Sequence, residues 1–129
     1  MTELLRKLNY KAQDPALILG APASFAPELE ALRSGCDLHE SQRAGLRYGF
    51  AIAFAPMKAD ALAAEEILRE ATSDGAVIWF AFPKQSSASM KSDLNRDRLW
   101  EVLAPLGWQP NRNVSIDADW SALRFRRTR

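Results

Sequence analysis

The chain has 129 residues, of which 47% are hydrophobic and 26% are charged, and its formal net charge is +1. This length predicts a single domain, residues 1–129, that buries its own core, and the near-neutral charge excludes a general attraction to nucleic acid or membranes. A single cysteine, Cys36, excludes an internal disulfide, and a single histidine, His39, excludes a histidine-based metal cluster.

The first 40 residues predict two short helices and two strands. Residues 1–8 carry three leucines at helical spacing, which predicts a leading helix, and the apolar run at 16–20 is typical of a buried parallel strand. A brief helix is expected over 28–32, followed by a weak strand within 36–40. The first seven residues contain acid and base and no apolar signal-peptide core, and no apolar run approaches the roughly 20 residues that a membrane span needs, so we expect a cytoplasmic protein.

Strands and helices alternate through the middle of the chain. Residues 48–55 and 76–82 are apolar runs typical of buried strands. Between them, residues 59–71 carry one apolar stripe at helical spacing and charged residues mostly elsewhere. A further helix is predicted over 94–106, with Gly107 just after its end.

The end of the chain changes character. Residues 113–117 and 120–126 alternate apolar and other side chains, and only Ala118 and Asp119 separate them, which predicts an antiparallel hairpin. The whole pattern predicts an α/β fold: an open, mostly parallel sheet with flanking helices in three layers, closed by that C-terminal hairpin.

Five segments together support a family resemblance: residues 8–11, 17–22, 79–84, 91–97 and 120–126. Through them the chain resembles a cut-down S-adenosylmethionine-dependent methyltransferase. More closely, it is similar to a family of small bacterial proteins of unknown function with that methyltransferase-like Rossmann fold. The resemblance covers nearly the whole chain. It implies the fold and no particular activity.

One junction concentrates polar groups that could bind an anion. The strand that ends near Phe82 leads into a Pro-Lys-Ser loop and then into a helix start, where backbone amides and basic side chains can converge on a phosphate or carboxylate. The competing interpretation is that Asp93 caps the helix, Arg96 pairs with a nearby aspartate and the serines only complete a turn. The candidate ligand-binding residues are Lys84, Ser86, Ser87, Lys91, Ser92, Asp93 and Arg96.

A methyltransferase of this architecture needs a glycine-rich turn after its first strand. Here the turn at 20–24 contains one glycine, and Pro22 has no amide donor. Glu40 has the spacing of a ribose-binding acid, but without the glycines this spacing is weak evidence. Residues 55–58 offer no acid, asparagine or aromatic side chain to hold an amine. S-adenosylmethionine is therefore a disfavoured cofactor. The sequence assigns no catalytic residue and no metal site. It leaves open whether the protein is an enzyme and favours a protein without catalytic activity.

Three functional hypotheses remain. The leading one is a non-catalytic binding or regulatory module that holds an anionic small molecule or an acidic protein segment at the junction of residues 84–97. The first alternative is a minimal transferase that uses S-adenosylmethionine or a nucleotide. The second is a weak nucleic-acid binder, because Arg124 and Arg126 share a strand face with Trp120, and Arg127 and Arg129 follow.

Overall fold

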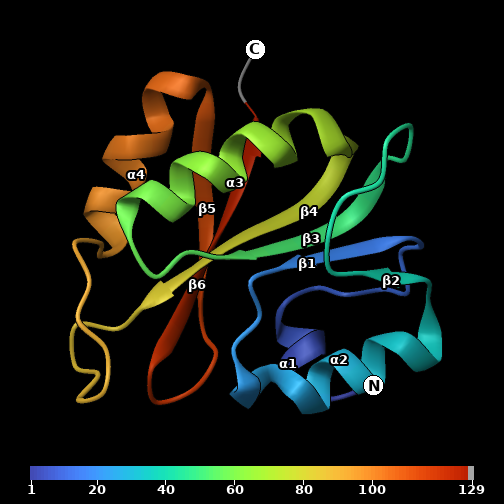
Figure 1. The fold of residues 1–129 in the computed structure, drawn as a ribbon, viewed down its shortest axis with the longest axis horizontal. Helices are drawn as coiled ribbons and strands as arrows, with labels where there is room; N and C mark the ends of the chain where they lie inside the picture. The colour runs from blue at the N-terminus through green and yellow to red at the C-terminus, as the bar shows by residue number, and fades with distance from the viewer. Residues whose placement is uncertain (128–129) are drawn as a thin grey trace.

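The computed structural model describes residues 1–127, which form a six-stranded sheet with helices on both faces (Figure 1). The strand order is β2-β1-β3-β4-β6-β5, in which β2, β1, β3 and β4 are parallel and β6 is antiparallel to both of its neighbours. This confirms the predicted fold class, with β6 inserted between β4 and β5. Arg129 lies outside the described residues.

The element bounds follow the predicted order. The helices are α1 (Glu3–Lys7), α2 (Ala26–Gly35), α3 (Lys58–Ala71) and α4 (Arg96–Leu103), with 3₁₀ turns η1 (Ala23–Phe25) and η2 (Ala104–Leu106). The strands are β1 (Ala16–Leu19), β2 (Leu38–His39), β3 (Tyr48–Phe54), β4 (Thr72–Pro83), β5 (Trp108–Ser115) and β6 (Trp120–Arg127). Within residues 1–127, no helix combines the length and the apolar character that a bilayer crossing requires.

Alternation along the central strands divides the core into two layers. On β3, Ala51 and Ala53 belong to the cluster under α3 and α4, whereas Phe50, Ile52 and Phe54 belong to the cluster under α1 and α2. Figure 1 shows these helix pairs on opposite faces of the sheet. On β3 the small side chains therefore face α3 and α4, and the large ones face α1 and α2. Alanine leaves little side-chain volume between strand and helix, which allows α3 to pack close to the sheet.

The connection between β2 and β3 contains no helix. Both strands flank β1, so the chain crosses over β1 through residues 40–47 alone. Parallel crossovers usually carry a helix that covers the sheet. Here the loop replaces it, and beside α3 this part of the sheet has only the loop above it.

Several bounds differ from the sequence prediction: α2 is longer than the expected 28–32, α4 begins two residues later than expected, and two strands begin earlier. β5 begins at Trp108 instead of residue 113, because an edge strand tolerates Pro110, and a register shift between Pro110 and Arg112 breaks the alternation. β4 begins at Thr72, directly after α3, and a register shift accommodates Gly75 at φ +77°. Both strand differences come from bulges, which two-residue periodicity does not register.

A histidine with Asp37 and Glu40 close by in the sequence is expected at the surface or boundary of the protein, but His39 is buried. Its Nδ1 is 2.5 Å from the Tyr48 hydroxyl and its Nε2 is 3.1 Å from Oδ2 of Asp37. The backbone N–H of Arg43 also donates to the Tyr48 hydroxyl at 3.3 Å. With both ring nitrogens partnered, His39 joins the two-residue strand β2 to β3, so its position is structural.

Candidate functional site

The order of the parallel strands reverses at β1 and β3, since the chain runs from β1 to one side of the sheet and returns to the other. Open α/β sheets bind ligands at the carboxyl ends of such a strand pair. In this chain the turn after β1 packs directly on the end of β3. Gly20 has φ +67°, and a Cβ there would lie 3.2 Å from the carbonyl oxygen of Phe54. Glycine is thus needed for packing at this position.

Aromatic side chains fill the space below this turn. Phe25 contacts Phe54 edge-to-face with ring centroids 5.0 Å apart, and Phe54 contacts Trp120 in the same way at 5.2 Å. All three are buried. Glu40, at the position of a ribose-binding acid, forms an ion pair with Arg33 at 2.7 Å. With a single glycine in the turn as well, these residues do not fit S-adenosylmethionine.

The loop after β4 is attached to the β5–β6 turn. The hydroxyls of Ser87 and Ser89 donate to Oδ1 of Asp119 at 2.6 and 3.0 Å, and the backbone N–H of Lys84 donates to the Asp119 carbonyl at 2.7 Å. The Ser87 bond, then the Ser89 bond, lowers the pKa of the Asp119 carboxyl. Ser87, one of the predicted ligand-binding residues, thus already has a partner within the fold.

Ser92 and Asp93 also have partners within the fold. The Ser92 hydroxyl donates to the carbonyl of Pro56 at 2.6 Å, and the Asp93 carboxylate accepts from the backbone N–H of Lys58 at 2.7 Å, at the first residue of α3. Asn95 caps α4, because its side chain accepts from the backbone N–H of Arg98 at 2.8 Å. Asp93 therefore caps a different helix from the one that the sequence suggested.

We expect the Asp119 carboxylate to make the protein sensitive to acid. Its folded pKa lies below the ordinary value of about 4, so the stability it contributes is present above that value and is lost as the pH falls through the folded pKa. In urea titrations, the free energy of unfolding of Asp119→Asn should be lower than that of wild type at pH 7, and the difference should shrink below about pH 4. Ser87→Ala should behave in the same way, and pH profiles parallel to that of wild type would contradict the assignment.

Lys84 and Arg96 line the same depression. It has a volume of about 320 Å³ and lies between the end of β4, the start of α4 and the adjoining strands β5 and β6. The ammonium group of Lys84 donates to Ser115 at 2.6 Å, which orients it, and Arg96 has only a loose 3.6 Å contact with Asp97. Both cations therefore retain donors for an anion. The other lining residues are Phe82, Gln85, Asn95, Asp97, Asn113 and Ser121.

A second depression of about 380 Å³ shares Arg96, Asp97 and Asn113 with the first. Its wall includes Trp100, which is 49% exposed. Trp100 lies four residues after Arg96, on the same face of α4. Helical periodicity predicts that Trp100 lies on the same side of α4 as Arg96. That β5 forms the opposite wall of the depression is visible only in the tertiary structure.

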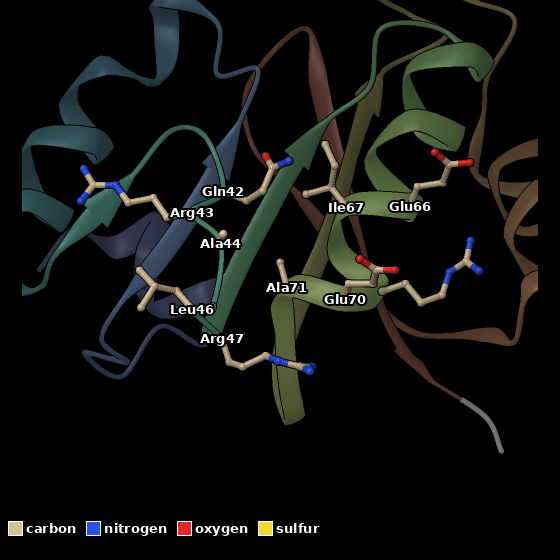
Figure 2. Close-up of a pocket in the computed structure, with 11 residues that line it drawn as sticks. Gln42, Arg43, Ala44, Leu46, Arg47, Glu66, Ile67, Glu70 and Ala71 are labelled. Carbon is tan, nitrogen blue, oxygen red and sulfur yellow. The ribbon is translucent and has the colours of Figure 1, made fainter.

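A larger depression, of about 1050 Å³, lies at the amino ends of the strands, between the loop that follows β2 and the last turns of α3. Its lining carries charges of both signs, with arginines at 43, 47 and 69 and glutamates at 66 and 70, and Figure 2 shows that Arg43 points away from the hollow. We therefore place the candidate site at Lys84 and Arg96. Ser86 and Lys91 of the predicted set are exposed on the loop and do not line either depression beside α4.

Comparison with known proteins identifies the fold. No family model and no curated protein matches the chain. Among solved structures, a SAM-dependent methyltransferase from Aquifex aeolicus has a TM-score of 0.63 at 13% identity, covering 95% of this chain and 87% of that one. The DhpI–SAH complex has a TM-score of 0.63 at 14% identity, covering 97% of this chain and 82% of that one. The ribosomal protein L11 methylase from Lactobacillus delbrueckii subsp. bulgaricus has a TM-score of 0.60 at 11% identity, covering 98% of this chain and 75% of that one. The chain has the methyltransferase-like Rossmann fold.

Proposed function

We propose that this protein is a non-catalytic binding module that holds a small anion in the depression formed by Lys84 and Arg96. The observation that carries the proposal is the pairing of these two cations, from different elements, at the first turn of α4. Asn95 caps one amide of that turn, and the positive end of the helix adds to the field at the site. Phosphate and carboxylate are the groups that such donors bind.

The exposed indole of Trp100 suggests more about the ligand. The depression that it lines continues from the one at Arg96, so an anion bound there could extend a flat apolar group along α4. The ligand class that we propose is a phosphate or carboxylate ester or acid carrying such a group. An acidic side chain of a protein segment would use the same donors.

The alternative is a transferase that uses S-adenosylmethionine. It is supported by the solved structures, which include methyltransferases with bound SAH or sinefungin. Against it stand the closed turn at Gly20 and the aromatic contacts of Phe25 and Phe54. A minimal transferase would need this region to open.

The test is a thermal-shift screen of the whole chain with inorganic phosphate, AMP, succinate and S-adenosylhomocysteine. A bound anion raises the unfolding midpoint by mass action. We expect phosphate or AMP to raise it in wild type, with the shift lost in the double variant Lys84→Ala/Arg96→Ala. The control Lys91→Ala/Arg47→Ala removes the same charge elsewhere and should keep the shift.

Two results would change the conclusion. If no anion stabilises wild type more than the double variant, the start of α4 is a capped helix and nothing more. If S-adenosylhomocysteine binds with a micromolar dissociation constant in calorimetry, the transferase alternative replaces the binding module.

A further inference from the structure

Three arginines share one face of the β5–β6 pair. Arg112 and Arg124 are direct partners in the antiparallel register, and Arg126 lies two residues further along β6. Directly opposed residues project to the same side of a sheet with Cβ atoms about 5 Å apart. Arg112 and Arg126 are exposed, and Arg124 is half-buried. Two arginines therefore occupy directly opposed positions on the two strands, and Arg112, on the edge strand, also lines the depression beside Trp100.

No carboxylate neutralises this pair. In the described part of the chain, neither Arg112 nor Arg124 forms an ion pair, and neither guanidinium donates a hydrogen bond. Like charges directly opposite each other on a sheet are destabilising. Arg126 donates to Gln109 at 3.1 Å and lies beside Asp74 in a small depression, so Arg112 and Arg124 carry the argument.

Arg127, on the other face of β6, shows what a structural arginine looks like in this chain. It donates to the carbonyl of Leu68 at 2.8 Å, bonds to Thr72 and lies 5.4 Å from the Trp108 ring. The contrast with Arg127 indicates that Arg112 and Arg124 are not held in place by the fold. They retain their donors for a partner.

We propose that the face of Arg112 and Arg124 binds the phosphate backbone of a nucleic acid without reading its sequence. Aromatic stacking is excluded on this face, because Trp79 and Trp120, which share it, are buried. Trp79 is the β4 partner of Arg124, and its indole N–H donates to the carbonyl of Leu8, so the segment after α1 covers this part of the face. The three arginines occupy neighbouring positions of one strand pair, and such a cluster suits a polymer of regularly spaced negative charges.

Fluorescence anisotropy with a labelled 20-nucleotide single strand tests the proposal. Two phosphate contacts predict a log–log salt slope of about −1.4, and losing one contact should change it by about 0.7. We expect Arg112→Gln and Arg124→Gln each to weaken binding several-fold at low salt and to flatten the slope. Arg47→Gln, which removes the same charge from an exposed loop at the amino ends of the strands, should bind like wild type.

The thermal midpoint gives a second readout. Because the two charges repel, Arg112→Gln should raise the low-salt midpoint by about 1–3 °C while it weakens binding. The proposal is overturned if wild type does not bind the strand at low salt, or if Arg47→Gln loses as much affinity. Binding to phosphatidylserine vesicles or to polyglutamate, but not to the oligonucleotide, also overturns it. A lower midpoint for the edge-strand variant Arg112→Gln would show that the arginine is structural.

Discussion

Trp79→Ala should lower the free energy of unfolding by about 3–5 kcal/mol. Trp79 is 0% exposed in the middle of β4, and its indole N–H donates to the carbonyl of Leu8 at 2.8 Å. The substitution removes one of the two tryptophans of that core layer and also the hydrogen bond that attaches the segment after α1 to the sheet. A loss of this size corresponds to about 10–20 °C in the thermal midpoint and can be measured by urea and thermal unfolding.

A second substitution separates the two contributions at this position. Trp79→Phe keeps an apolar ring but leaves the Leu8 carbonyl without its donor. It should lower the free energy of unfolding by less than the alanine variant does, but still by more than about 1 kcal/mol, which is the effect of one unsatisfied buried group. Trp100→Ala is the matched control, because Trp100 is half exposed, and it should change the stability by less than about 1 kcal/mol. Equal losses for Trp79→Ala and Trp100→Ala would contradict the described core.

Glu65→Ala should lower the free energy of unfolding by about 2–3 kcal/mol, which is a large effect for the substitution of a charged residue. Glu65 lies on α3 with a side chain that is only 1% exposed, and its carboxylate accepts from the Trp108 indole N–H at 2.9 Å. Arg69, one turn later on the helix, donates two bonds to it at 2.6 and 3.0 Å. Without the carboxylate, the buried indole N–H loses its acceptor, and α3 loses its polar link to β5.

Glu65→Gln isolates the charge, because its amide oxygen can still accept from Trp108. It should recover most of the lost stability, while the bidentate Arg69 contact, which raises the pKa of that guanidinium, is weakened. Glu66→Ala, at the next and exposed position, should be nearly neutral. If Glu65→Ala and Glu66→Ala are equally mild, the buried hydrogen bond contributes little to stability.

Long-range pairing explains which parts of the fold were predictable. The apolar runs that became β1, β3 and β4, and the stripe that became α3, follow from local periodicity because both sides of each strand are covered. Trp108 was outside the predicted strand, since an edge strand with Pro110 and a bulge has no regular alternation. The burial of His39 depends on Tyr48, which lies on another strand and leaves no local signal.

The candidate site was predictable only in outline. The sequence places Lys84 and Arg96 on either side of one strand-to-helix junction, and in the structure both line the same depression. The internal roles of Ser87 and Asp93 depend on Asp119 and Lys58, at separations of about 30 residues in the chain. Polar residue types in a loop indicate donors and acceptors, but they do not show which of them the fold itself uses.

The helix-free crossover between β2 and β3 also has a consequence for engineering. Residues 40–47 are exposed, and they run from the edge strand β2 over β1 to β3. Exposed loops with few backbone partners accept inserted sequence best. A whole strand-and-helix unit could be grafted there, lengthening the sheet beyond β2 and covering the bare face beside α3, while the junction of Lys84 and Arg96 at the other side of the sheet stays intact.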